Sequence, residues 1–247
     1  MRKVFISGGT SGIGLACVRL FLNKGYAVAT TARDQEKQEN LQAMDFENKE
    51  NLQVKICNLS QSNSVLKLCK FLENYNPDLL INNAAMYAGN DLLQVSNEDL
   101  DKIFDTNLKS VILLSSSCAQ TWRKTSRNGN IINIGSTLGN KPASGTSFYS
   151  ASKAALVSIT QSFAMEFAPD IRANIIMPGV VATPIHAKVM GEDAAQSFQK
   201  DMASAHPLGR IGTPEEFANM LFNLDQPSFN WMTGSVITVD GGISLIS

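Results

Sequence analysis

Three side chains in the middle of the sequence have the types and the spacing of a proton-transfer site. Ser136 follows the apolar run 131–134, which is typical of a buried strand, and Tyr149 and Lys153 stand four residues apart where a helical pattern begins. Residues four apart share one face of a helix. The phenol of a free tyrosine has a pKa of about 10, and an adjacent ammonium favours the phenolate, so we expect Lys153 to lower the pKa of Tyr149. Such a tyrosine exchanges a proton near neutral pH while Ser136 holds the substrate oxygen.

A tyrosine and a lysine at this spacing are by themselves more typical of a core residue and a surface residue on an ordinary helix. The start of the sequence favours the chemical interpretation. An apolar strand at 4–6 leads into the glycine-rich segment 7–14, and an amphipathic helical pattern follows over 13–24. A strand, a Gly-rich turn and a helix N-terminus present backbone N–H groups to a phosphate. The sequence therefore predicts a dinucleotide-binding site at its N-terminal end.

The end of the second predicted strand, 27–31, indicates which dinucleotide binds. In nucleotide-binding folds an acidic residue here binds the ribose 2′-hydroxyl of NAD, whereas a basic residue accommodates the 2′-phosphate of NADP. No carboxylate stands at 30–32, and Arg33 follows at once; its guanidinium suits a phosphate in charge and in geometry. The alternative is that Asp34 selects the cofactor and Arg33 is a solvated loop residue. We favour NADP(H) over NAD(H).

Strand-like apolar runs alternate with helical patterns along the whole chain. Strands are expected at 4–6, 27–31, 53–57, 79–81, 131–134, 172–177 and 235–239, and helices at 13–24, 34–44, 60–74, after Ser96, at 151–168 and at 214–224. This alternation predicts an α/β fold, a single domain over 1–247 built on a Rossmann-type, doubly wound parallel sheet of about seven strands with helices on both faces. The segment 180–207 shows no strong strand pattern, and we expect a mobile, partly helical substrate lid at about 185–205.

Composition argues against several other classes of protein. Of the 247 residues, 44% are hydrophobic and 17% are charged, and the net charge of −1 gives no footprint for nucleic acid or for a membrane surface. No apolar run approaches the ~20 residues of a membrane helix, and no signal peptide is expected before the first strand. The four cysteines are scattered and only two histidines occur, so neither disulfides nor a metal site are expected. We expect a cytoplasmic protein.

Over its whole length the sequence resembles the short-chain dehydrogenase/reductase family. The motifs that carry the resemblance are Ser7-Gly8-x-x-x-Gly12-x-Gly14, Asn82-Asn83-Ala84-Ala85, Ser136 thirteen residues before Tyr149, Tyr149-x-x-x-Lys153, Pro178-Gly179 and Val239-Asp240-Gly241-Gly242. Departures from the family pattern, such as Asn58 where an Asp is usual, remove no catalytic group.

The resemblance implies a catalytic set and a cofactor site. The catalytic residues are Asn107, Ser136, Tyr149 and Lys153, and the cofactor-binding residues are Gly8, Thr10, Ser11, Gly12, Ile13, Gly14, Arg33, Asn58, Leu59, Asn83, Ala84, Tyr149, Lys153, Pro178, Gly179, Val181 and Thr183. Asn107 stands inside a helical pattern, where asparagine has poor propensity. It is either a surface residue or a point where the helix bends and offers a carbonyl to a water. The resemblance implies the second, with that water joining Lys153 to solvent.

The implied reaction is hydride transfer between nicotinamide C4 and a carbonyl carbon, with Tyr149 giving or taking the proton. The layout is close to that of 3-oxoacyl-acyl-carrier-protein reductases, yet the residues 180–185 differ from their usual pattern and Asn130 stands where an Arg is expected, although Arg127 lies near. Docking of a carrier protein is therefore in doubt, and the substrate is a small-molecule carbonyl or an acyl thioester. A sugar, polyol or small-ketone reductase is the alternative. A non-catalytic cofactor-binding regulator is a third, which the intact catalytic set argues against.

Family members are commonly tetramers built through two long helices and the last strand. In this chain those are about 96–124, 149–168 and 235–247, and the second helix carries small residues, Ala154, Ala155 and Ala164, that allow close packing. The bland alternative is that these residues pack only on their own sheet. We expect a homotetramer or a homodimer, with no nucleic-acid or membrane partner.

Overall fold

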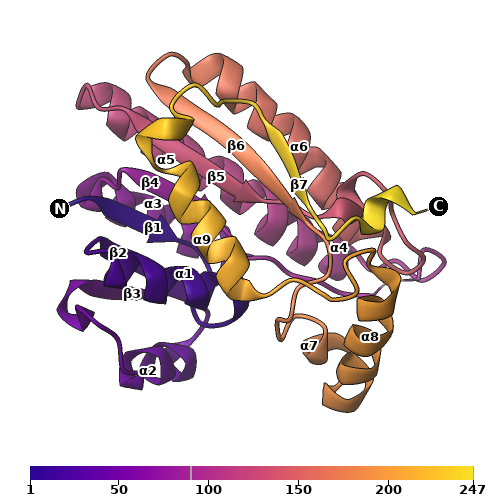
Figure 1. Ribbon diagram of the computed structural model, residues 1–247. Helices are drawn as coiled ribbons and strands as arrows, with labels where there is room; N and C mark the ends of the chain where they lie inside the picture. Colours follow the sequence, from indigo (N-terminus) through magenta and orange to yellow (C-terminus); the bar gives the residue numbers. More distant parts are fainter. Residues whose placement is uncertain (90, 247) are drawn as a thin grey trace.

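Seven parallel strands form one sheet through the centre of the molecule (Figure 1), in a computed structural model that describes residues 1–89 and 91–246. Across the sheet they are β3 (Leu52–Ile56), β2 (Ala27–Ala32), β1 (Lys3–Ile6), β4 (Leu79–Asn82), β5 (Gly129–Ile134), β6 (Ile171–Pro178) and β7 (Val236–Val239). The strand order reverses direction between β1 and β4, as in a doubly wound sheet. The predicted fold class is confirmed, and each strand lies within two residues of its predicted position.

Helices cover both faces of the sheet. Helices α1 (Gly12–Asn23), α2 (Gln35–Ala43) and α9 (Pro214–Leu224) lie on one face, and α3 (Ser62–Tyr75), α5 (Ser110–Lys124) and α6 (Ser147–Phe167) lie on the other, with α4 (Asn97–Phe104) against α6. Two further helices, α7 (Ala187–Met190) and α8 (Glu192–Ala205), lie beyond the strand ends (Figure 1). Within the described ranges, no helix is long enough and apolar enough to cross a membrane.

The strands read as apolar runs because each of their faces packs against helices. Along β1, Val4 and Ile6 enter the core beneath α1 and α9, while Phe5 enters the core on the opposite face. Leu79 and Leu80 of β4 divide in the same way between the two cores. Burial on both faces explains why the strands could be predicted from composition alone.

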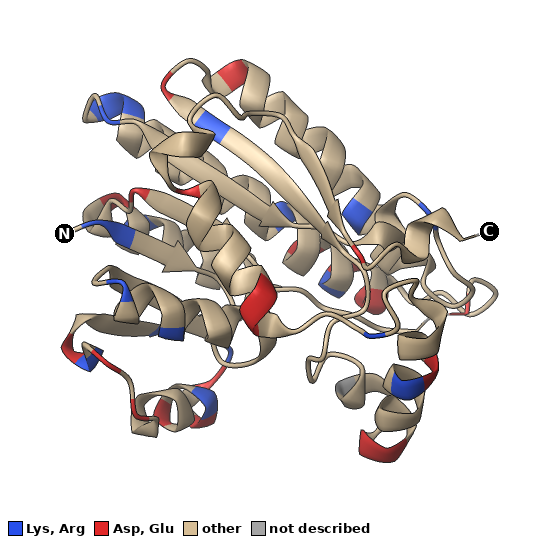
Figure 2. Cartoon of the chain, in the orientation of Figure 1, with Lys and Arg blue, Asp and Glu red and all other residues tan. Residues whose placement is uncertain are grey.

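Charged side chains are concentrated outside the sheet. In Figure 2, lysines, arginines and carboxylates are interspersed along the outer helices and turns. Within the strands as the structure describes them, charged residues are confined to Lys3, Lys55 and Arg172. The carboxyl ends of the central strands are thus free to hold a ligand on backbone groups and small side chains.

A buried carboxylate holds the opposite, amino-terminal end of the sheet together. Both oxygens of Asp225 accept hydrogen bonds from Arg2 at 2.9 Å, and the carboxylate also accepts from the hydroxyl of Tyr26 at 3.0 Å. Asn130 donates to the same carboxylate at 3.2 Å. Asn130 stands where the resemblance leads one to expect an arginine. Its hydrogen bond to Asp225 gives it a structural role in the fold.

Two predicted helix boundaries are wrong. The helix expected at 151–168 begins four residues earlier, at Ser147. The third helix begins at Ser62 and not at Ser60, with Gln61 as its N-cap. The side-chain oxygen of Asn58 accepts hydrogen bonds from the backbone N–H of Ser60 at 3.2 Å and from its hydroxyl at 2.9 Å. This local turn keeps 58–60 outside the helix, because an asparagine side chain competes with helical hydrogen bonding.

Candidate active site

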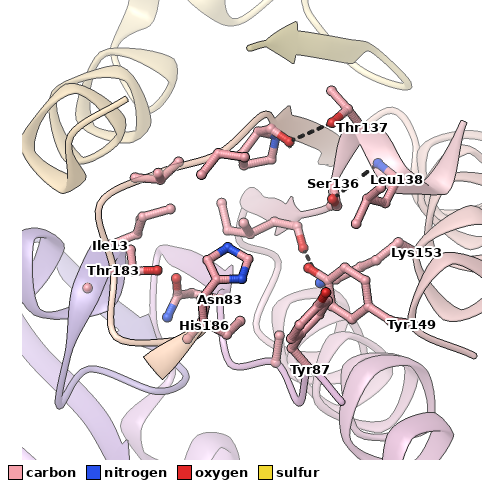
Figure 3. Close-up of a pocket in the computed structure, with 18 of the residues that line it drawn as sticks. Ile13, Asn83, Tyr87, Ser136, Thr137, Leu138, Tyr149, Lys153, Thr183 and His186 are labelled. Atoms are coloured by element: carbon pink, nitrogen blue, oxygen red, sulfur yellow. Dashed lines mark hydrogen bonds between the residues drawn. The ribbon is translucent and has the colours of Figure 1, made fainter. Parts of the chain in front are cut away.

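A cavity of about 1010 Å³ lies along the carboxyl ends of the parallel strands. Its walls come from the glycine-rich turn after β1, the end of β2, the loops after β4, β5 and β6, and helix α8. Figure 3 shows the part of the cavity around Ser136, Tyr149 and His186. In open α/β sheets this edge, at the point where the strand order reverses, is where ligands bind.

The glycine-rich turn is fixed by hydrogen bonds that leave the start of α1 open. The backbone N–H of Gly8 donates to the hydroxyl of Thr31 at 2.8 Å. The side-chain amide of Asn83 donates to the carbonyls of Ser7 and Gly8 at 3.0 and 3.1 Å. Ser11 is the N-cap of α1, and its side chain makes no capping hydrogen bond. The first N–H groups of the helix thus remain available to an anion.

Two glycines of this turn have different tasks. Gly12 has a positive φ of 54°, and a Cβ there would lie 2.9 Å from Cγ2 of Thr183, so the loop after β6 comes close to the bare backbone. A Cβ on Gly14 would lie 2.2 Å from the carbonyl oxygen of Gly8. Gly14 is buried, does not line the cavity and packs beneath the turn, and its contact with the cofactor stays a prediction. The turn is closely packed and lies beside the open N-terminus of α1. This combination fits the pyrophosphate of a dinucleotide.

The end of the cavity at β2 is cationic. Arg33 and Lys37 both line it, and none of the lining residues in the described part of the chain is Asp or Glu. The carboxylate of Asp34 accepts the backbone N–H of Lys37 at 2.9 Å and caps α2. This engagement weakens the alternative in which Asp34 selects the cofactor. Sequence reasoning missed Lys37; its position four residues after Arg33, in the first turn of the predicted helix, was the available signal.

The three predicted proton-transfer residues meet in the same cavity. Tyr149 and Lys153 share one face of α6, where they are 8% and 2% exposed, and Ser136 follows β5 with 8% exposed. The hydroxyl of Ser136 is hydrogen-bonded with the phenol of Tyr149 and accepts the backbone N–H of Leu138 at 3.2 Å. The ammonium of Lys153 donates to the carbonyl oxygen of Ile134 at 2.7 Å and lies 5.6 Å from the centroid of the Tyr149 ring (Figure 3).

Burial controls the protonation of this group. It raises the pKa of Tyr149 to about 12, against the opposing effect of the hydrogen bond with Ser136, and it lowers the pKa of Lys153 to about 8. The prediction of a lowered pKa for Tyr149 is therefore wrong in this structure. The reason is that the lysine bonds to the backbone of Ile134 while the phenol is desolvated. At neutral pH Tyr149 carries its proton, which is the state that a general acid needs.

Asn107 lies in a π-helical turn, Asp105–Lys109, between α4 and α5. Its side-chain oxygen accepts the backbone N–H of Met86 at 2.7 Å, and its amide donates to the Met86 carbonyl at 2.9 Å and to the hydroxyl of Ser152 at 3.1 Å. The helix is thus irregular where a bend is expected. Asn107 is fully buried and does not line the cavity, and its side chain ties the loop after β4 to the helix that carries Tyr149.

The other end of the cavity has an aromatic wall that the sequence did not reveal. The ring of Tyr87 lies edge-on to Tyr149 with centroids 5.0 Å apart and edge-on to His186 at 5.3 Å. His186 in turn lies 4.7 Å from Phe198 of α8. Phe198 and Met202 bring the segment 185–205 onto the cavity as two helices, and the mobility predicted for it stays a prediction. These residues come from distant parts of the chain and follow no motif.

Most of the predicted site residues line the cavity. They are Gly8, Thr10, Ser11, Gly12, Ile13, Arg33, Asn58, Leu59, Asn83, Ala84, Ser136, Tyr149, Lys153, Pro178, Gly179, Val181 and Thr183. Gly14 and Asn107 lie behind it, as described above.

Comparison with known proteins places this geometry among oxidoreductases. Residues 8–244 match the family model described as enoyl-(acyl carrier protein) reductase. The chain is 33% identical to the 3-oxoacyl-[acyl-carrier-protein] reductase FabG of Chlamydia pneumoniae, over 98% of this chain and 97% of that protein. It is 35% identical to a tropinone reductase homolog of Arabidopsis thaliana, over 99% of this chain and 91% of that protein.

Solved structures give the same result. A 4-hydroxyisoleucine dehydrogenase complexed with NADH superposes with a TM-score of 0.89 at 31% identity, and each chain is covered completely. A single-residue variant of actinorhodin polyketide ketoreductase with NADPH superposes with a TM-score of 0.87 at 27% identity, over 98% of this chain and 97% of the other. Similar structures are thus described with either nicotinamide cofactor.

Proposed function

The chain belongs to the short-chain dehydrogenase/reductase family, and on that premise we propose that it reduces a ketone carbonyl to a secondary alcohol with NADPH. The observation that carries the proposal is the meeting of Ser136, Tyr149 and Lys153 in one cavity with the open N-terminus of α1. A proton donor and a dinucleotide cradle in the same cavity suit hydride transfer.

The preference for NADP(H) rests on charge. Arg33 and Lys37 line the end of the cavity where the adenosine ribose lies in this type of fold, and Asp34 is engaged in capping α2. A guanidinium and an ammonium together favour a ligand with the additional 2′-phosphate. The cofactor-binding residues predicted from the sequence complete the cradle, with Thr183 beside the glycine-rich turn.

The chemistry then divides between the cofactor and the chain. When bound, the reduced nicotinamide supplies a hydride to the carbonyl carbon. Tyr149 donates its proton to the carbonyl oxygen, which the hydroxyl of Ser136 holds by a hydrogen bond. The charge left on the phenolate is stabilised by the nearby ammonium of Lys153. One hydride and one proton are thus added per carbonyl, and the backbone at Asn107 offers the route by which solvent returns the proton.

The substrate is either a 3-oxoacyl thioester or a smaller ketone. The relative from Chlamydia pneumoniae supports the first. Two observations favour a sugar, polyol or small-ketone reductase: Arg127 is paired with Asp78, and Asn130 is bonded to Asp225, so both are engaged at the end of the sheet opposite the cavity. The intact catalytic set argues against a non-catalytic regulator.

Two predictions concern the protein as a whole. The outer edge of β7 has no strand neighbour within the described chain, and Met165 on α6 is 82% exposed, which supports a homodimer or homotetramer through these elements. Light scattering after size exclusion tests this, and a mass near that of one protomer would contradict it. A cytoplasmic location stays a prediction.

The test of the proposed function is oxidation of NADPH, with NADH in parallel, in the presence of acetoacetyl-CoA. We expect turnover with NADPH and its loss in the Tyr149→Phe variant, which keeps the ring and removes the proton. Nucleotide binding by this variant, followed by cofactor fluorescence, is the control for folding. Turnover that survives Tyr149→Phe would overturn the mechanism, and no turnover with intact NADPH binding would direct the search to sugars and small ketones.

A further inference from the structure

An imidazole lies in the substrate half of the cavity and has no part in the reduction described above. His186 follows the loop after β6, and its ring lies 5.3 Å from that of Tyr87 (Figure 3). It also lies 4.7 Å from the ring of Phe198, measured between centroids. Tyr87 in turn contacts the ring of Tyr149. Only the width of one aromatic ring therefore separates His186 from the proton donor.

This imidazole has unused hydrogen-bonding capacity. Its Nδ1 is buried, and among the residues that the structure describes it has no hydrogen-bond partner. Burial lowers the pKa of His186, so the ring is neutral at physiological pH and has one N–H donor and one acceptor nitrogen. A buried polar atom without a partner is unfavourable, and a turn of the ring that brings this nitrogen to a bound molecule removes that penalty.

Several apolar side chains line the cavity together with His186. Phe198 packs against its ring, and Ile185, Met202 and Ile243 also line the cavity. A purely apolar substrate would fit this wall equally well if His186 were a phenylalanine. The packing of this wall does not require a histidine, so its polar nitrogens serve to discriminate between substrates.

We propose that His186 is a specificity-determining residue that hydrogen-bonds a second oxygen of the substrate, a few bonds away from the carbonyl that is reduced. The substrate class is then a bifunctional ketone, with a carbonyl, ester or hydroxyl oxygen beside the reacting group, and not a hydrocarbon ketone. This inference rests on the proposed reduction of a ketone at Tyr149.

The kinetic test compares two ketones of equal chain length, ethyl acetoacetate and 2-heptanone. The first has an ester group beside the ketone, and the second has no oxygen other than that of the ketone. The variant His186→Phe keeps the ring contacts and removes both nitrogens, and His186→Asn restores a donor and an acceptor. We expect His186→Phe to lower kcat/KM for ethyl acetoacetate by about tenfold or more and that for 2-heptanone by less than about twofold. His186→Asn recovers part of the loss. Ratios of variant to wild type are taken within each ketone, so that intrinsic reactivity cancels.

A second measurement does not depend on turnover. The chain has only two histidines, so ¹⁵N-histidine labelling gives two imidazole spin systems, which the His186→Phe variant assigns. His206 is the internal control, because its Nδ1 lies 2.5 Å from the carbonyl oxygen of Met202. In the presence of NADP⁺, which cannot reduce a ketone, we expect ethyl acetoacetate to shift the nitrogen resonances of His186 and leave those of His206 in place.

The outcomes separate this inference from the proposed function. Shifts of His186 without turnover in the NADPH assay support the inference and contradict the reduction. Turnover without any shift of the His186 resonances overturns the inference and leaves the reduction standing. An equal loss of kcat/KM for both ketones in His186→Phe does the same. Absence of any spectral response and of any turnover with either ketone overturns the inference as well.

Discussion

The ammonium of Lys153 lies 2.7 Å from the carbonyl oxygen of Ile134, the last residue of β5, so a buried cation is anchored on the backbone of the sheet. This bond holds the lysine beneath Tyr149 without direct pairing to the phenol. The lysine side chain is almost completely buried, and burial disfavours its charged form. The protein therefore keeps a destabilising charge where the proposed mechanism needs one.

Lys153→Met is expected to abolish reduction and to raise stability at pH 7. The folded-state pKa of Lys153 is lowered to about 8 from 10.5, so below about pH 8 the folded protein must hold an unfavourable proton, and this penalty disappears as pH rises towards 10.5. The free energy of unfolding should rise by about 1–3 kcal/mol, less than the shift alone implies because the bond to Ile134 is lost. Chemical denaturation measures it.

The same measurement at higher pH provides the control. The gain from Lys153→Met should shrink above about pH 8, where the wild-type lysine loses its proton in the folded state. A variant that is less stable than wild type at pH 7 would show that the bond to Ile134 outweighs the burial of charge.

Removing either cation at the β2 end of the cavity should change the choice of cofactor. Arg33→Ala and Lys37→Ala are each expected to lower kcat/KM for NADPH by about tenfold, the effect of losing one charge-assisted hydrogen bond, and to leave that for NADH nearly unchanged. Steady-state kinetics with both cofactors measures the ratio. Lys124→Ala, at the exposed end of α5, removes the same charge away from the cavity and should change neither. Equal losses for both cofactors would argue against a 2′-phosphate site.

Asn107 should act as a positioning residue. Asn107→Ala leaves the N–H and the carbonyl of Met86 without their partners, and we expect a loss of about 1–3 kcal/mol in the free energy of unfolding. Because the loop that carries Tyr87 loses its anchor, KM for the ketone should rise while KM for NADPH stays constant. Ser152→Ala, which removes only one of the bonds to Asn107, should cost less. A rise of both KM values together would indicate general destabilisation instead.

Gly14→Ala should disrupt the turn that cradles the nucleotide. The added Cβ would lie 2.2 Å from the carbonyl oxygen of Gly8, so the backbone must shift. We expect weaker NADPH binding and a melting temperature lowered by several degrees, from an overpacking cost of about 1–3 kcal/mol. Gly89→Ala is the matched control, because a Cβ there meets no atom closer than 3.9 Å. Unchanged nucleotide affinity in Gly14→Ala would show that the turn adapts.

Local patterns made the sheet and the proton-transfer residues predictable. The strands are continuous apolar runs because both faces of the sheet are covered, and Tyr149 and Lys153 share a face because helical spacing is fixed. Arg33 could be found because it directly follows a strand. Each of these inferences depends on neighbours within a few residues of the chain.

What the sequence missed depends on distant neighbours. The pKa of Tyr149 moves opposite to expectation because burial, a property of the folded molecule, outweighs the hydrogen bond with Ser136. The aromatic wall joins Tyr87 to His186 and Phe198, which stand about a hundred residues further along the chain and obey no spacing rule. Lys37 belongs to neither group, because its position four residues after Arg33 is a local signal.

The pairing of Arg2 with Asp225 has a consequence for how the protein is made. These residues are 223 positions apart, and helix α1 packs against α9, so α1 awaits a partner that is synthesised about two hundred residues later. Until α9 is synthesised, the apolar face formed by Cys17, Phe21 and their neighbours is only partly covered. Synthesis proceeds at about 5–20 residues per second, so the nascent chain exposes this face for many seconds. This part of the core therefore forms only after α9 has been made, and until then the nascent chain presents apolar surface of the kind that chaperones bind.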